Sequence, residues 1–361
     1  MTERVQAALE RAQAGGPFAG RCDTVRRDVV IGDPQAPIRT FFEILDRHGL
    51  IGADGTLADG VHLTSVGDHF DYGGLDRARD AARDGLLLLG WLAAHDASRT
   101  TIIAGNHDLG RVGELAAFDD TRFATAQNRA ARVYGSGDAE AEAAFLAAYP
   151  ELPSSEVAAR DFSAFTVAQR QLVTHLLRSR RMRMARAVGS KLIVHAGVTR
   201  NDVEGDDATS IAAWLDQRLD AAVDAWTDGP LVIDALHHPG NASDGEGGGV
   251  LYHRPAWPHG DTRWFSGPYR RRFDPMQLPR GVLQIVGHIR DRKCRALLGV
   301  GGEAIDGPLR VLRVPQRTYE FGTVEAVGED EAAMVFVDGG MGYGGAPRYE
   351  LLDVATMQPL R

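Results

Sequence analysis

The sequence predicts an α/β fold, and three observations support that prediction. Short apolar runs rich in β-branched residues each stop at glycine and polar residues, as buried strands do. Segments of helical character follow the first three runs, and strands that alternate with helices form α/β sheets. Two later runs, Leu309–Val314 and Met334–Val337, alternate in the manner of strands and predict a second sheet. The five buried strands are predicted at Val29–Ile31, Val61–Val66, Thr101–Ile103, Leu192–Val194 and Leu283–Val286.

The predicted helices occupy the intervals between these strands. A short helix is expected in the first half of Met1–Gly20, and others over Ile38–His48, over Leu75–His95 and after Asp108. The most apolar stretch, Gly85–Ala94, has ten residues. That is roughly half of the ~20 needed to span a bilayer, so it is predicted to be a buried helix.

Residues 109–190 are rich in Ala, Glu and Arg, with helical candidates over Asp138–Ala148 and Val167–Val188. We interpret this stretch as a helical insertion or cap within a single domain that covers residues 1–361. From Pro230 to Gly281 the composition shifts toward Gly, Pro, His and Trp, which indicates a long loop. Long loops of this kind are often functional.

Charge and cysteine content narrow the class of protein. The chain has 40 basic and 49 acidic residues, a net charge of −9, so no global field attracts duplex nucleic acid or anionic lipid. The two cysteines, Cys22 and Cys294, form no disulfide framework and fit a reducing cytoplasm. The N-terminus lacks the apolar core of a signal peptide. We therefore expect a cytoplasmic protein that is not associated with a membrane.

The chemistry of the chain concentrates where the predicted strands end. Each of the five ends carries glycine beside oxygen or imidazole donors, and turns alone do not require this pattern. In an α/β sheet such ends meet at one edge. Two Asp, one Gln, one Asn and two His suit two divalent transition metals better than calcium or a structural zinc. The segments are Gly32-Asp33-Pro34-Gln35, Gly67-Asp68-His69-Phe70-Asp71, Gly105-Asn106-His107-Asp108, Val194-His195-Ala196-Gly197 and Gly287-His288.

In order and strand placement, these segments resemble the signature of the calcineurin-like metallophosphoesterases, over residues 29–290. The single late histidine resembles the branch with serine/threonine phosphoprotein phosphatases and diadenosine tetraphosphate hydrolases. Two segments, Val250–Arg254 and Val337–Met341, resemble elements of its Shewanella-like members. The resemblance implies a four-layer αββα sandwich of two mixed sheets with a helical insertion.

The resemblance also implies a role for each matching residue. Asp33 and Gln35 would bind a first metal, Asp68 would bridge two metals, and Asn106, His195 and His288 would hold the second. His107 would be the general acid, oriented by Asp71, and Arg254 would grip the phosphoryl oxygens. His69 lies inside the second segment and is a candidate supporting residue.

Two positions depart from the family pattern. Gln35 stands where the family usually has histidine, and its amide oxygen is a weaker and harder donor than imidazole. We therefore expect a labile first ion, with Mn or Fe favoured and Zn possible. Tyr72 stands where this branch usually has arginine, which removes one charged clamp on phosphate. Arg77 and Arg290 are candidates to replace it.

The predicted activity is hydrolysis of phosphoesters by two divalent metal ions. Phosphoserine or phosphothreonine in protein is the first choice of substrate. A dinucleoside polyphosphate or another nucleotide is the second, because Tyr252, Trp257, Trp264 and Tyr269 could stack a base. Two alternatives are a metal-binding pseudoenzyme and a non-hydrolytic enzyme on the same di-metal scaffold. The sequence leaves the oligomeric state, the native metal pair and the physiological substrate open.

Overall fold

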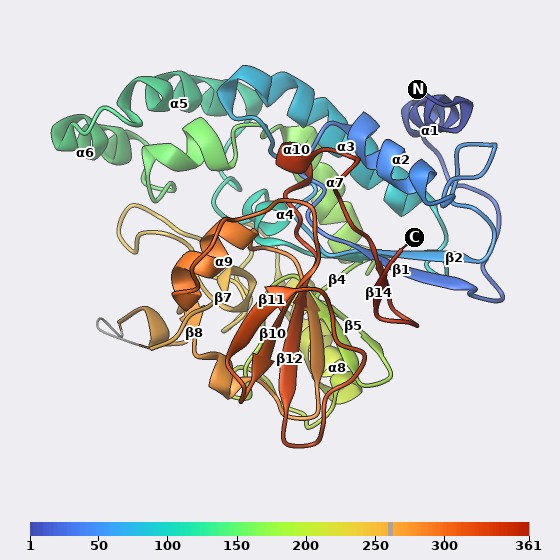
Figure 1. Cartoon of the computed structure of the whole chain (residues 1–361). Coiled ribbons are helices and arrows are strands. Elements are labelled where there is room, and N and C mark those ends of the chain that lie inside the picture. Colours follow the sequence, from blue (N-terminus) through green and yellow to red (C-terminus); the bar gives the residue numbers. More distant parts are fainter. Residues whose placement is uncertain (259–262, 361) are drawn as a thin grey trace.

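The computed structural model describes residues 1–258 and 263–360, and within them the chain is a mixed α/β protein built on two six-stranded sheets (Figure 1). Residues 259–262 of the predicted long loop lie outside the described part. In the first sheet, β1 to β4 are parallel, β13 adds antiparallel to β1, and β14 pairs antiparallel with β13. Its strands, in spatial order, are β14 (Gln358–Pro359), β13 (Leu352–Asp353), β1 (Arg27–Ile31), β2 (Val61–Ser65), β3 (Thr100–Ile103) and β4 (Met182–Arg183).

The second sheet is also mixed. Its three central strands are parallel and three antiparallel strands flank them. In spatial order the strands are β11 (Thr318–Phe321), β10 (Arg310–Val314), β12 (Ala332–Phe336), β9 (Leu283–Val286), β6 (Lys191–Val194) and β5 (Ala185–Val188). A separate pair, β7 (Arg254–Pro255) and β8 (Arg272–Phe273), belongs to the long loop region. Every strand predicted from the sequence is present, so the α/β prediction and the second sheet are confirmed.

The two sheets pack face to face, as the alternation of side chains along the strands shows. Val30, Ile193 and Ile285 point into a common apolar layer between the sheets. Their strand neighbours Val29 and Val194 belong to the other large core, which the helices cover. Because successive side chains of a strand point to opposite faces, each sheet buries both of its faces. The result is the predicted four-layer arrangement.

Helices cover the outer faces of both sheets (Figure 1). On the first sheet, α2 buries Phe41, Phe42 and Leu45, and α3 buries Trp91 among them. α8 packs against β5 and β6 of the second sheet. Within the described residues, each helix is too short or too polar to cross a bilayer. These helices are α1 (Glu3–Ala14), α2 (Ile38–Arg47), α3 (Ala78–Ala94), α8 (Ala208–Ala225), α9 (Asp291–Leu298) and α10 (Met341–Gly344).

The predicted helical insertion has an apolar core of its own. Phe118, Phe123 and Phe145 form a buried cluster distinct from the two cores of the sheets. The segment contains α5 (Asp120–Val133), α6 (Ala139–Ala148), the π-helix η2 (Val157–Asp161) and α7 (Val167–Arg178). The remaining short 3-10 helices of the chain are η1 (Leu75–Arg77), η3 (Val250–Tyr252), η4 (Arg263–Phe265) and η5 (Pro275–Gln277).

One predicted helix, Val167–Val188, is wrong in its second half. The helix ends at Arg178, and Arg180 adopts a left-handed conformation at φ 56°. The following residues form β4 and β5, which join the edges of the two sheets. Pairing with β3 and β6 overrides the local helical pattern, because it supplies long-range backbone hydrogen bonds that the isolated segment lacks. The last part of the 109–190 range therefore consists of the sheet strands β4 and β5.

Candidate metal centre

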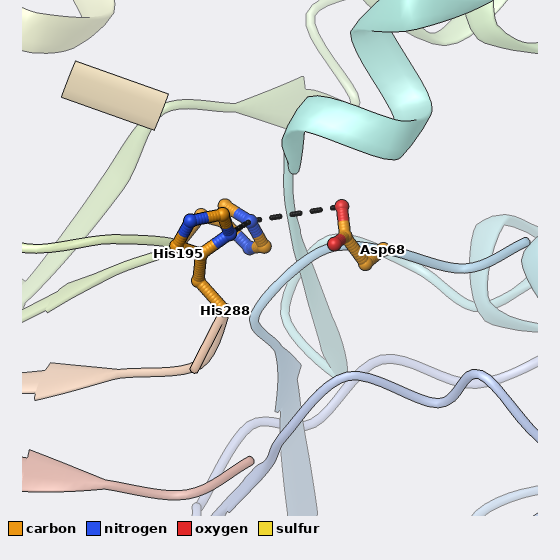
Figure 2. Close-up of side chains that lie close together, drawn as sticks. All are labelled: Asp68, His195 and His288. Atoms are coloured by element: carbon orange, nitrogen blue, oxygen red, sulfur yellow. Dashed lines mark hydrogen bonds and ion pairs between the residues drawn. The ribbon is translucent and has the colours of Figure 1, made fainter. Parts of the chain in front are cut away.

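The predicted ligands lie at the carboxyl ends of five strands from both sheets. Asp33 follows β1 and Asp68 follows β2, while Asn106 begins the short helix α4 (Asn106–Gly110) after β3. His195 follows β6 and His288 follows β9 in the second sheet. The ligand atoms of Asp68, His195 and His288 lie within 4.8 Å of one another (Figure 2). Strands that are distant in sequence thus bring their ends to one place.

His195 is the centre of this group. Its Nδ1–H donates to the Val66 carbonyl at 2.7 Å, which leaves Nε2 with a lone pair. Nε2 lies 3.1 Å from His288 Nδ1 and 3.6 Å from Asp68 Oδ1. The Asn106 side-chain oxygen is also 3.1 Å from it. A proton on Nε2 could satisfy only one of these three neighbours.

The arrangement fits a bound cation. Donor atoms held about 2.0 to 2.2 Å from one metal at tetrahedral or octahedral angles lie roughly 2.8 to 3.6 Å apart. The three separations around His195 Nε2 fall within that range. His195 is fully buried, so water cannot readily screen these converging lone pairs. The donor set of carboxylate, amide oxygen and imidazole is one that divalent transition metals accept.

Asp33 lies on the other side of His288. Both of its carboxylate oxygens are 3.0 Å from the His288 backbone N–H, which donates to them. Burial and the charges of Asp338 and Asp68 raise the pKa of Asp33 well above its usual range. Gln35 is half-buried two residues on, and its side chain has no hydrogen bond among the residues that the structure describes. The predicted first site therefore has one carboxylate in place and an amide free to turn.

The glycines at the strand ends have a steric purpose. A Cβ on Gly105 would collide with the Asp68 carboxylate, and a Cβ on Gly287 would collide with that of Asp33. Asp68 and His288 themselves adopt left-handed conformations, at φ 56° and φ 66°. Such conformations are costly for non-glycine residues and cluster at functional sites. The backbone is thus shaped to let the candidate ligands approach one another.

Asp108 holds the loop that carries Asp68. Its carboxylate accepts from the backbone N–H groups of Asp68, His69 and Gly105, at 3.0, 3.1 and 2.9 Å. Burial alone would raise the pKa of Asp108, but the His69 imidazole and these N–H groups lower it to about 2. His69 Nδ1 lies 3.0 Å from Asp108, and its Nε2 contacts the Ser65 hydroxyl. His69 therefore supports the loop and does not face the cluster.

The predicted acid pair is also assembled. His107 Nδ1 is 2.9 Å from Asp71 Oδ2, and the His107 side chain is 19% exposed. Burial would lower the pKa of His107, but the Asp68 charge and the Asp71 hydrogen bond raise it to about 9. An imidazolium with one N–H on Asp71 keeps its other N–H free for a ligand.

Arg111 is a site residue that our sequence analysis missed. Its buried guanidinium lies 2.7 Å from Asp71 Oδ2 and donates to the His107 carbonyl at 2.8 Å. Although burial acts in the opposite direction, Arg111 and His107 lower the pKa of Asp71. The insertion contributes as well, because the Ala164 N–H donates to Asp71 at 3.1 Å. The only sequence signal for Arg111 is its position one helical turn after His107.

Arg254 is half-buried beside the cluster. Its Nε has no hydrogen-bond partner, and Arg254 has no ion pair among the described residues. Burial lowers the pKa of Arg254 to about 10, and its charge is one of the causes that lower the pKa of His288. A half-buried guanidinium that forms no ion pair with a described carboxylate can bind an anion from solution.

Tyr72 and the two proposed substitutes for the missing arginine are engaged elsewhere. The Tyr72 hydroxyl donates to Asp84 at 2.7 Å, which raises its pKa together with burial. Arg77 pairs with Asp80 at 3.2 Å, and Arg290 pairs with Asp306 at 2.8 Å. Neither arginine is available as a clamp in this conformation.

Comparison with known proteins adds little to this picture. No protein-family model matches the chain, and no curated protein matches it. Among solved structures, the chain is similar to a protein serine/threonine phosphatase from Saccharomyces cerevisiae that has similarity to human phosphatase PP5. The two share 13% identity at a TM-score of 0.36, over 94% of this chain and 78% of that one. The residues of the site itself carry the functional inference.

The converging lone pairs lead to a prediction about thermal stability. Mn²⁺ should raise the Tm, because a ligand present at 100 times its Kd stabilises the folded state by about 2.7 kcal/mol. His195→Ala should lose most of that rise. His62→Ala should keep it, since His62 bonds to Ser98 and Thr101 away from the cluster. A Tm that does not respond to divalent metals in the unmodified protein would contradict the metal centre. Thermal unfolding followed by circular dichroism makes the comparison.

Proposed function

We propose that the protein is a dinuclear-metal phosphoester hydrolase that acts on phosphoserine and phosphothreonine in proteins. One observation carries this proposal: four lone-pair atoms converge beside an acid pair and an unpaired buried arginine. Each part matches one requirement of phosphoryl transfer, namely charge neutralisation, a proton for the leaving group and a grip on the phosphoryl oxygens. Two free cysteines are consistent with residence in the cytoplasm.

The residues that would hold the two cations follow from the site. Asn106, His195 and His288 would hold the second cation, Asp33 and Gln35 the first, and Asp68 both. When bound, the cations supply positive charge for the phosphoryl oxygens and a reactive water at neutral pH. The amide of Gln35 favours Mn or Fe at the first site, with Zn possible, because it is a harder donor than imidazole.

His107 would donate the proton that the leaving group needs. Asp71 fixes its Nδ1, so the proton to be transferred sits on Nε2. The hydrogen bond to Asp71 favours the protonated imidazole. Arg111 and the Ala164 N–H hold Asp71 in turn. Arg111 is thus a positioning residue for the acid.

Arg254 would bind the phosphoryl group before reaction. Its forked N–H groups match two oxygens of a phosphate, and the absence of a neighbouring ion pair leaves them free for substrate. With Tyr72 held by Asp84, Arg254 is the one candidate clamp from the sequence analysis that no acid occupies among the described residues. Binding of substrate phosphate should therefore depend strongly on this residue.

The aromatic residues of the long loop do not favour a nucleotide over a phosphoprotein. Tyr252 is buried and donates to Glu114, and Tyr269 stacks on His238. Trp257 lies under Arg317. Trp264 is exposed, but Arg272 covers its ring. All four residues proposed to stack a base thus have partners within the protein, which supports the phosphoprotein as first choice.

His107→Asn should separate proton donation from metal binding. We expect turnover of alkyl phosphates to fall roughly 100-fold or more, with metal content unchanged. p-Nitrophenyl phosphate should lose much less, because its leaving group hardly needs protonation. Steady-state kinetics on the two esters gives the comparison. An equal loss for both esters would show that His107 is not the acid.

Arg254→Met should weaken phosphate binding. Loss of a charged hydrogen-bond pair costs about 1.5 to 3 kcal/mol, which corresponds to roughly a 10- to 150-fold drop in kcat/KM. The kcat/KM of Arg254→Lys should lie between those of Arg254→Met and the unmodified protein, because lysine keeps the charge but lacks the forked N–H groups of the guanidinium. Inhibition by inorganic phosphate should weaken in parallel. Unchanged inhibition in Arg254→Met would remove Arg254 from the substrate site.

The decisive test of the proposed function is a substrate panel with protein reconstituted in Mn²⁺, Fe²⁺ or Zn²⁺. Phosphopeptides, dinucleoside polyphosphates, nucleotides and phosphodiesters are compared by release of phosphate or of the cleaved product. Preference for phosphoserine or phosphothreonine peptides supports the proposal, and preference for a nucleotide would replace its substrate. A metal-loaded protein that hydrolyses none of them would instead be a pseudoenzyme or a non-hydrolytic metalloprotein.

A further inference from the structure

Asp338 is a third buried carboxylate, on the side of the site proposed for the first cation. Asp338 follows β12, which pairs in parallel with β9, and the Val337 N–H donates to the Val286 carbonyl at 2.8 Å. Continuing that register places Asp338 level with His288. Asp338 is 6% exposed. It thus stands beside the strand end that delivers one of the candidate ligands.

The segment of Asp338 also touches the segment of Asp33. A Cβ on Gly32 would collide with the backbone of Val337 and Asp338, so the two chains are in direct contact. The Tyr349 hydroxyl donates to the Val337 carbonyl at 3.0 Å and fixes this approach from the other side. Asp33 is tied to His288 through the backbone N–H of the latter. Asp33, His288 and Asp338 therefore form one rigid corner.

No lysine or arginine of the described residues forms an ion pair with the Asp338 carboxylate. Burial raises the pKa of Asp338, although the charges of Arg310 and Arg290 act to lower it. Its carboxylate accepts from the Gly340 N–H at 2.8 Å and has no ion pair in the described part of the chain. Arg310, which is buried nearby, donates to the backbone carbonyl of Asp338 and not to its carboxylate. Arg290 is held by Asp306.

Asp33 and Asp68 also have no lysine or arginine partner among the described residues. Asp33 has no ion pair with a described lysine or arginine, and Asp68 pairs only with His195, at 3.6 Å. Buried charges in proteins are paired or coordinate metals. Asp33 and Asp338, two buried acids without an ion pair among the described residues, therefore call for a cation at this corner.

We propose that Asp338 is part of the first cation's site, where its carboxylate shares that cation with Asp33 and offsets the weak donor Gln35. This inference rests on the proposed function, because it assumes that a divalent cation binds beside Asp33. It concerns a residue for which the sequence analysis gave no role. The negative charge of Asp338 strengthens binding of any cation at this corner, whereas the neutral amide of Gln35 contributes only a dipole.

Asp338→Asn tests the assignment with little change of shape. The asparagine side-chain oxygen can still accept from the Gly340 N–H, so the local turn is preserved. Mn²⁺ binding is measured by calorimetric titration together with metal analysis after dialysis. We expect the first cation to bind about 10- to 100-fold more weakly and the second to be unaffected. Asp306→Asn is the matched control, since Asp306 lies nearby but is neutralised by Arg290.

A second measurement separates this effect from a folding defect. Without metal, Asp338→Asn should be as stable as the unmodified protein or more so, because it removes one of three buried like charges. Its Tm should rise less on addition of Mn²⁺. Adding Gln35→His to Asp338→Asn should recover much of the lost affinity, because imidazole replaces the weak amide donor.

Each outcome decides the inference. Equal Mn²⁺ affinity at both sites in Asp338→Asn and the unmodified protein would overturn it while leaving the proposed function intact. Equal weakening at both sites would also overturn it, since Asp338 would then act on the whole centre. Failure of the unmodified protein to bind any divalent metal would overturn the inference and the proposed function together. Selective loss of one cation, restored by Gln35→His, would support it.

Discussion

The constraint on which the rest of the site depends is electrostatic. Oxygen and nitrogen lone pairs from four strand ends face one another where water is scarce, and they repel unless positive charge lies between them. The surrounding residues hold these atoms in place at a local cost in conformational free energy. Glycines permit close contact with the carboxylates, and Asp68 and His288 adopt left-handed backbone conformations. Asp108 accepts hydrogen bonds from the backbone N–H groups of the loop. A bound cation would offset this repulsion, and these features are consistent with such a site.

The site has two halves that come from different parts of the fold. The candidate metal ligands lie on loops that follow strands of the two sheets, so sheet packing fixes their relative positions. The acid half depends on the helical insertion as well. Phe162 meets the His107 ring edge to face at 5.2 Å, and Ala164 bonds Asp71. The predicted insertion therefore contacts both the proposed acid His107 and its partner Asp71. Packing within the insertion thus helps to position these two side chains.

The two departures from the family pattern have different structural outcomes. The Tyr72 hydroxyl is bonded to Asp84 of α3, so the proposed binding of phosphate depends on Arg254. Gln35 remains half-buried without a hydrogen bond in the described part of the chain, beside two acids that lack cationic partners. A weaker donor set with additional negative charge would hold a hard, exchangeable ion better than a tightly bound zinc.

The sequence by itself determined β1, β2, β3, β6, β9, β10 and β12, most helices and the identity of the strand-end residues, because these depend on local periodicity and on residue chemistry. It could not determine that Val167–Val188 changes from helix to strand, since sheet pairing with β3 and β6 decides this. Nor could it select Arg111 from other charged residues, or give a role to Asp338 within the Val337–Met341 segment that it singled out. Their roles arise from contacts between residues that are distant in sequence. Arg111 contacts Asp71, which lies 40 residues earlier, and the segment of Asp338 contacts the segment of Asp33. Burial and neighbouring charge, which only the tertiary structure sets, turn ordinary side chains into parts of a site.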